Sequence, residues 1–126
     1  MGFHFSKEEF LNRKEKILNS MKNEGLDALI MFRQESMYWL TGYDTFGYVF
    51  FQALILDQKG NVILLTRAPD LRQAQNTSNI SDIRIWVDKD GANPTDDLKI
   101  ILDELNLKGK KLALNMRHTV LPEEMH

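Results

Sequence analysis

The stretch that decides the fold is residues 35–57, ESMYWLTGYDTFGYVFFQALILD. A block ending in Leu-Thr-Gly (residues 38–42) comes first, a small loop (residues 43–47) follows, and residues 48–56 are then apolar almost without interruption. A strand that is apolar at successive positions is normally covered on both faces. We therefore expect residues 48–56 to form a central strand of a sheet with helices on both sides.

The loop in this stretch is rich in aromatic side chains and is bracketed by Gly42 and Gly47. Glycine lets the backbone turn sharply or approach another group closely. Aromatic residues beside such a loop can line a pocket or an interface. Buried aromatic residues that only fill the core are common too, so both interpretations stay open from the residues alone.

The composition describes an ordinary soluble domain. The chain has 126 residues, 43% hydrophobic and 27% charged, which suits one domain with a real core. A net charge of −2 argues against nucleic acid as the main partner. No apolar run reaches the ~18 residues that span a bilayer, and the N-terminus lacks a signal-peptide pattern. With no cysteine in the chain, disulfide and thiolate chemistry are excluded. We expect a cytoplasmic protein that does not bind membranes.

Hydrophobic periodicity, together with capping and turn residues, predicts helices and strands that alternate along the chain. Helices are predicted at residues 7–24, 34–41 and 70–75, and another begins at Pro94 after an Asn93 cap. Strands are predicted at residues 26–32, 48–56, 62–66, 83–87 and 110–115, with a hairpin turn at residues 57–60. In the strand at residues 83–87, Ile83, Ile85 and Val87 alternate with Arg84 and Trp86, which predicts one wetter face. The order favours an α/β fold with a mixed sheet flanked by helices. Residues 121–124 have the form of a first helical turn, so we expect the chain to be part of a longer protein.

Known catalytic patterns are missing from the sequence. The histidines, His4, His118 and His126, form no HxH or HExxH pair, and the aspartates are scattered at element ends. No serine lies in a GxSxG context, and there is no glycine-rich phosphate loop. We therefore predict no catalytic residue and no metal site within this chain.

Two features still favour a binding role. One is the aromatic loop, which carries Asp44, Phe46 and Tyr48. The other is Arg67 at the end of a predicted strand, where a guanidinium can bind a carboxylate through two hydrogen bonds. An exposed arginine that merely pairs with a nearby aspartate is the alternative for Arg67.

Several blocks of the chain resemble one known family. They are Phe5-Ser6 with Glu9, the Asn12-Arg13 pair, residues 25–29 (GLDAL), and residues 38–42 with their Leu-Thr-Gly ending, followed by the long strand and hairpin. Together they resemble the N-terminal domain of the creatinase/prolidase (M24, Xaa-Pro peptidase) family over residues 5–115. The resemblance implies a ribonuclease-H-like domain, here residues 1–126, with no metal ligands of its own.

The same resemblance implies what the rest of such a protein does. A C-terminal pita-bread domain, absent from this chain, holds a divalent metal pair (Mn, Co or Zn) whose activated water attacks an amide or C–N bond. The N-terminal domain takes part in a homodimer, and its loop closes over the partner subunit's active site. Asp44, Phe46, Tyr48 and Arg67 are the candidate substrate-gating residues, while the fragment alone is inactive.

One departure bears on the substrate. In creatinases an arginine follows the Phe-Gly of this loop, whereas here Tyr48 follows Phe46-Gly47. Creatine is therefore not the expected substrate. A small peptide with an Xaa-Pro bond, cleaved by a dipeptidase or aminopeptidase, and a small amide such as ectoine remain open. A stand-alone adaptor module and a ribonuclease-H-like nuclease are the alternatives from other functional classes.

Overall fold

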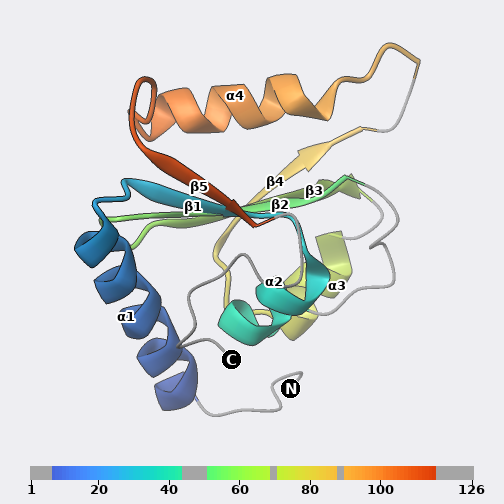
Figure 1. Ribbon diagram of the computed structural model, residues 1–126. Helices are drawn as coiled ribbons and strands as arrows, with labels where there is room; N and C mark the ends of the chain where they lie inside the picture. The colour runs from blue at the N-terminus through green and yellow to red at the C-terminus, as the bar shows by residue number, and fades with distance from the viewer. Residues whose placement is uncertain (1–6, 44–50, 69–70, 88–89, 116–126) are drawn as a thin grey trace.

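The structure is a computed structural model, and it describes residues 7–43, 51–68, 71–87 and 90–115. Strands and helices alternate along most of the chain (Figure 1). In chain order the elements are α1 (Lys7–Glu24), β1 (Ala28–Met31), α2 (Gln34–Thr41), β2 (Ala53–Asp57), β3 (Val62–Arg67), α3 (Leu71–Thr77), β4 (Asp82–Trp86), α4 (Pro94–Glu104) and β5 (Leu112–Asn115).

The five strands form one mixed sheet in the order β4-β3-β2-β1-β5. The central strand β2 is antiparallel to both neighbours, while β1 pairs with β5 and β3 pairs with β4 in parallel. It follows that β4, β3, β1 and β5 all run in one direction, so their carboxyl ends share one edge of the sheet. The expectation of a mixed sheet with an apolar central strand is confirmed.

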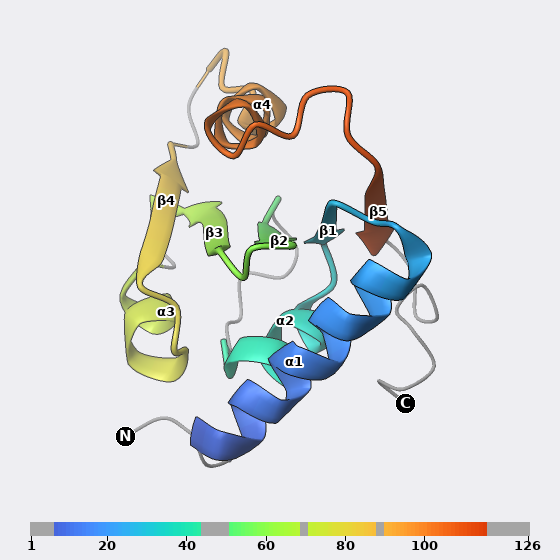
Figure 2. The same cartoon turned by 90° about the vertical axis from the view of Figure 1, so that its left-hand side faces the viewer.

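Helices cover the two faces unequally. The helices α1, α2 and α3 lie on one face, and α4 alone lies on the other (Figures 1 and 2). Two hydrophobic clusters result, one on each face. Met21, Met37 and Leu64 belong to the first, and Ile55, Leu65 and Ile101 belong to the second. Successive residues of β2 point to opposite faces, and all five are buried, which explains why its first four residues, 53–56, are apolar without alternation.

The first helices match their predicted bounds because their sequence signals are strong. The stripe of α1 buries Phe10, Ile17 and Met21, as its helical spacing predicted. The end of α2 is fixed by Gly42, whose φ of 82° lies in the left-handed region and whose amide donates to the carbonyl of Tyr38 at 2.8 Å. The capping box predicted at Ser6 lies outside the described residues.

Two predictions need correction. The strand predicted at residues 48–56 begins only at Ala53, with Phe51 and Gln52 preceding it and residues 48–50 outside the described part. Asn93 occupies the N-cap position of α4, but its side chain does not cap the helix; it accepts the Thr95 hydroxyl instead. Other strand ends differ by one or two residues, as is usual for boundaries.

Candidate functional site

The candidate site lies at the carboxyl edge of the four parallel strands, where β2 also begins. In open α/β sheets, ligands bind outside the carboxyl ends of the strands. Three of the predicted gating residues, Asp44, Phe46 and Tyr48, lie outside the described residues. The fourth, Arg67, ends β3 at this edge. What the structure describes is therefore the two ends of the predicted loop and the strand ends around them.

The N-terminal end of the loop is held by Tyr43, a fully buried residue that sequence reasoning did not single out as an anchor. Its hydroxyl lies 3.2 Å from the hydroxyl of Thr66 on β3. The Tyr43 carbonyl accepts from the side-chain amide of Gln34 at 2.8 Å, and its amide donates to the hydroxyl of Thr41 at 3.2 Å. The side chain is thus tied to strand β3, and the backbone is tied to helix α2.

The C-terminal end of the loop is held by Phe51 through a different set of contacts. The indole N–H of Trp86, at the end of β4, donates to the Phe51 carbonyl at 3.0 Å. The Phe51 ring meets that of Phe32 edge to face, with 5.9 Å between ring centroids. Strand β4 and the residue that follows β1 therefore both help to fix where the chain leaves the loop.

Arg67 lies between these two anchors in the fold. It follows Thr66 directly along β3 and is the register partner of Trp86 on β4. Its side chain is half-buried. The edge also carries Arg33, which forms an ion pair with Glu35. The structure thus brings one predicted site residue to the same edge as both ends of the predicted loop.

The anchoring side chains Gln34, Thr66 and Trp86 were missed by sequence reasoning. Trp86 entered the prediction only as a residue that alternates with isoleucines in the strand. The usable signal was chemical: a tryptophan at a strand end carries an N–H donor that needs a partner when the ring is buried. Trp86 is only 7% exposed, so such a partner was to be expected.

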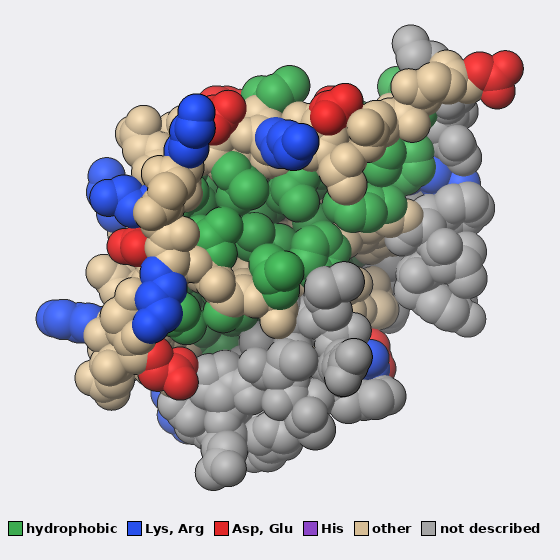
Figure 3. Space-filling view, turned by 45° about the horizontal axis from the view of Figure 1, so that its top comes forward, with side chains coloured by type: hydrophobic (Ala, Val, Ile, Leu, Met, Phe, Trp, Pro, Cys, Tyr) green, Lys and Arg blue, Asp and Glu red, His purple; other side chains and the backbone are tan. Residues whose placement is uncertain are grey.

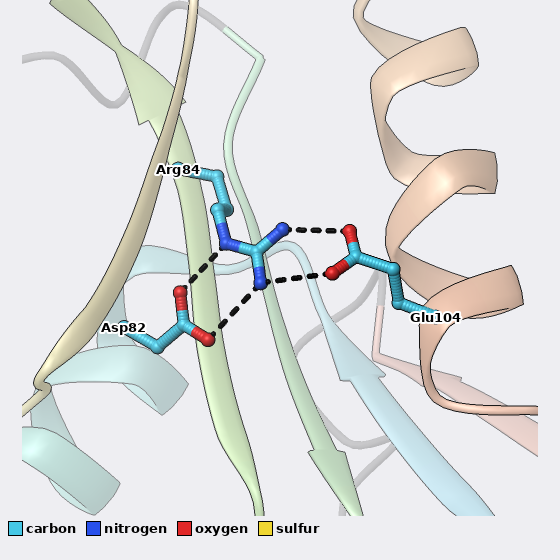
Figure 4. A network of polar contacts seen from close by, with 3 residues as sticks. All are labelled: Asp82, Arg84 and Glu104. Carbon is cyan, nitrogen blue, oxygen red and sulfur yellow. Dashed lines mark hydrogen bonds and ion pairs between the residues drawn. The ribbon is translucent and has the colours of Figure 1, made fainter.

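A cluster of charged side chains in the described part joins β4 to α4. Arg84 donates to both carboxylate oxygens of Asp82, at 2.7 and 3.2 Å, and to both of Glu104, at 2.7 and 3.2 Å (Figure 4). Hydrogen bonds from Asp82 and then Glu104 raise the pKa of Arg84 above its already high ordinary value. This arginine therefore stays charged throughout the working pH range.

Carboxylates in the described part of the chain do not gather into a metal site. Within it there is no group of three or more His, Cys, Asp or Glu that could hold a metal ion. Asp27 and Asp57 lie together at the opposite, amino edge of the sheet. Asp27 accepts the Lys111 amide at 2.9 Å, and Asp57 accepts the backbone amide and side chain of Asn61 at 2.8 and 2.9 Å. These carboxylates accept hydrogen bonds from neighbouring backbone and side-chain groups. The described residues do not support the nuclease alternative, which needs a third acidic side chain at the site.

None of the described helices is both long and apolar enough to cross a membrane.

Comparison with known sequences gives two results. The profile of the Creatinase/Prolidase N-terminal domain matches residues 13–124. The ectoine hydrolase of Halomonas elongata is 30% identical over 86 residues, which are 68% of this chain and 20% of that protein. The chain spans about a fifth of the length of the curated relatives that it matches.

Solved structures share the fold. A dipeptidase from Pyrococcus horikoshii OT3 superposes with a TM-score of 0.69 at 22% identity, covering 85% of this chain and 29% of that one. The separately solved N-terminal domain of an Xaa-Pro dipeptidase from Lactobacillus brevis gives a TM-score of 0.71 at 13% identity, covering 81% of this chain and 75% of that one. At these identities the likeness establishes the fold. With the profile covering most of the sequence, the chain belongs to the creatinase/prolidase N-terminal domain family.

Proposed function

We propose that this chain is the non-catalytic N-terminal domain of a metal-dependent hydrolase of the Xaa-Pro dipeptidase or aminopeptidase type. In this proposal the domain joins a homodimer, and the segment between Tyr43 and Phe51 reaches the active site of the partner subunit. The single observation that supports this role is the double anchoring of that segment. Both of its ends are hydrogen-bonded to the carboxyl edge of the sheet.

Anchored ends suit a segment that must present side chains accurately. A binding residue that is misplaced by about 1 Å can lose much of its effect on catalysis. A loop whose two ends are fixed by hydrogen bonds loses less conformational entropy when it binds. Asp44, Phe46 and Tyr48 are the side chains that we assign to contact the substrate or the rim of the partner's site, with Arg67 beside the root of the loop.

The chemistry itself is assigned to a C-terminal domain that this chain does not contain. The described residues do not fit a metal pair, because their acidic side chains are dispersed or engaged in turns. The divalent metal pair, Mn, Co or Zn, would be held by that other domain and would supply the activated water. The described residues of this chain would bind and orient, and no step of bond cleavage is placed on them. The cytoplasmic location inferred from the sequence stays a prediction.

A second candidate substrate is a small cyclic or linear amide rather than an Xaa-Pro peptide. It is favoured by one observation, the 30% identity to a protein named ectoine hydrolase. The dipeptidases among the solved structures are less similar in sequence. The fold and the anchored segment are compatible with both substrates, because each substrate class is a small molecule with an amide-like bond.

The experiment that tests the proposal uses the full-length protein with its metal. Turnover of an Xaa-Pro dipeptide and of ectoine is measured, together with metal content. We expect Phe46→Ala to raise KM for the true substrate while the bound metal stays unchanged. Ile100→Ala, on the exposed side of α4, is the matched control and should leave KM alone. An unchanged KM in the Phe46 variant would contradict the gating role, and a full-length sequence without a catalytic domain would favour the adaptor alternative.

A further inference from the structure

Arg13, on α1, is a charged residue that lies within the packing of the protein. On the α4 side of the molecule, charged side chains lie at the margin of the hydrophobic surface (Figure 3). The Arg13 side chain, in contrast, is only 14% exposed. It joins α1 to α2, which lie on the same face of the sheet (Figure 2). A guanidinium in such a place must be paired and hydrogen-bonded to offset its lost hydration, so its partners indicate its role.

Arg13 contacts a carboxylate, two aromatic rings and a backbone carbonyl. Its Nη2 pairs with the Glu9 carboxylate at 2.7 Å, one turn earlier on α1. Its guanidinium carbon lies 5.0 Å from the centroid of the Trp39 ring and 5.6 Å from that of the Phe10 ring. Its Nη1 donates to the Trp39 carbonyl at 2.7 Å. The carboxylate and the rings orient the guanidinium, and the carbonyl ties it to the backbone of α2.

The Trp39 carbonyl needs this donor because of the way α2 ends. In a helix that continued, this carbonyl would accept the amide of Tyr43, four residues later. That amide donates instead to the Thr41 hydroxyl at 3.2 Å, because Gly42 adopts a φ of 82° and turns the chain out of the helix. Arg13 supplies the missing donor. Its positive charge at the carboxyl end of the helix also interacts favourably with the helix dipole.

Two other carbonyls in the last turn of α2 also have donors. The Tyr38 carbonyl accepts the Gly42 amide at 2.8 Å, and the Thr41 carbonyl accepts the Asn79 amide at 3.0 Å. The helix has only eight residues, and its N-cap makes no side-chain cap hydrogen bond. A helix this short is marginally stable by itself. Contacts with other elements therefore help to decide where α2 ends, and the bond from Arg13 is one of these contacts.

The end of α2 determines where the anchored segment starts. Tyr43 is bonded to both ends of this helix, because Gln34 donates to its carbonyl and Thr41 accepts its amide. A shift of the last turn would move Tyr43 relative to Thr66 on β3, whose hydroxyl lies 3.2 Å from the Tyr43 hydroxyl. Hydrogen bonds weaken steeply as their geometry departs from the ideal. Through α2, Arg13 therefore acts on the position of Tyr43.

We propose that Arg13 is a positioning residue for the reaction. By donating to the Trp39 carbonyl it fixes where the chain leaves α2, and so it places Tyr43 and the segment that runs from Tyr43 to Phe51. The inference rests on the proposed function, in which this segment reaches the active site of the partner subunit. A lysine would replace Arg13 poorly, because it lacks the planar fork that stacks on a ring while donating in two directions.

Steady-state kinetics of the full-length, metal-loaded protein tests this role, with an Xaa-Pro dipeptide and ectoine as substrates. Arg13→Met keeps an aliphatic stem against the rings but removes the donors and the charge, whereas Arg13→Lys keeps the charge. We expect KM to rise about three- to tenfold in Arg13→Met and less in Arg13→Lys, with unchanged metal content. A purely structural role would reduce the amount of folded enzyme, and hence the apparent kcat, without changing KM.

Arg84→Met is the matched control. Arg84 also joins two elements through its guanidinium, but its partners Asp82 and Glu104 lie on β4 and α4. The control variant loses the same chemical groups at a place away from α2, so its KM should stay that of the unsubstituted protein. A rise in KM in Arg84→Met equal to that in Arg13→Met would overturn the inference.

A double variant tests the route of the effect. If Arg13 acts through the segment that carries Phe46, then Arg13→Met combined with Phe46→Ala should have about the KM of Phe46→Ala alone, because residues that act as one unit are not additive. Increases in KM that simply multiply would show that the two residues act independently, and would contradict the proposal.

Hydrogen exchange in the full-length protein gives a readout that does not depend on turnover. The Gly42 amide should exchange about tenfold faster in Arg13→Met, because the last turn of α2 opens more often. The Leu105 amide, which donates to the Ile101 carbonyl at the end of α4 at 3.1 Å, should keep its rate. Equal acceleration at both amides would indicate a global loss of stability and would overturn the inference.

Two results separate this inference from the proposed function. If Phe46→Ala raises KM while both Arg13 variants leave KM unchanged, the positioning role of Arg13 is wrong and the proposed function stands. If Phe46→Ala leaves KM unchanged while the Gly42 amide alone exchanges faster in Arg13→Met, Arg13 does fix the end of α2 and the proposed gating role fails.

Discussion

The hydrogen bond between Tyr43 and Thr66 gives a quantitative test of the anchored loop. Both side chains are fully buried, and their hydroxyl oxygens are 3.2 Å apart. Tyr43→Phe and Thr66→Val each remove one hydroxyl and leave the other buried without this partner, which costs about 1–3 kcal/mol in the free energy of unfolding. The double variant removes both hydroxyls and should cost less than the sum of the single variants. We expect a coupling energy of about 1 kcal/mol.

Urea unfolding of the 126-residue chain, followed by the fluorescence of its two tryptophans, measures all four members of the cycle. The control cycle pairs Tyr43→Phe with Thr95→Val. Thr95 is at the start of α4, which lies on the other face of the sheet from α2 and is not bonded to Tyr43 through Thr66. That pair should be additive to within about 0.5 kcal/mol. A coupling energy between positions 43 and 66 below about 0.3 kcal/mol would refute the reasoning, since the hydrogen bond between them would then add nothing measurable to the free energy of unfolding.

Three other substitutions test neighbouring features. Gly42→Ala places a side chain at a φ of 82° and should destabilise the chain by about 1–2 kcal/mol in urea unfolding; no loss would contradict the turn geometry. Trp86→Phe removes the donor to the Phe51 carbonyl and should cost about 1 kcal/mol, with faster proteolysis between residues 43 and 51 as the second readout. Arg84→Met should cost at most about 1 kcal/mol, because its side chain is 35% exposed. This cost should shrink in 1 M salt. It should stay constant from neutral pH to about pH 10, because the stability contributed by a group with a raised pKa is lost only as pH rises through that pKa. A decrease in the contribution of Arg84 to the free energy of unfolding near neutral pH would contradict the assignment.

The sequence predicted those parts of the fold that depend on local signals. The bounds of α1 and α2 follow from an amphipathic stripe and from a glycine that must adopt positive φ. The central position of β2 follows from burial of successive residues. These features need no knowledge of distant partners, and for that reason a single sequence was enough.

Features set by distant partners were not predictable in the same way. Alternation in β4 indicated a wetter face but not which residues would lie on it. In the structure Trp86 is buried, whereas Ile85, in the same edge strand, is 40% exposed. The choice depends on the Phe51 carbonyl, 35 residues away, which accepts the indole N–H. The anchors Gln34 and Thr66 were hidden for the same reason, because each makes sense only after Tyr43 has been placed in space.

The placement of β5 beside β1 has a consequence for biosynthesis. Lys111, just before β5, is separated by 84 residues from Asp27, whose carboxylate accepts its amide. At a translation rate of about 5–20 residues per second, β1 emerges from the ribosome about 4–17 s before its neighbour does. During that interval the apolar strand Ala28–Met31 has one unpaired edge. A nascent chain that pauses before β5 would thus present a ready template for strand pairing to any other chain nearby, so β5 also protects β1 against aggregation.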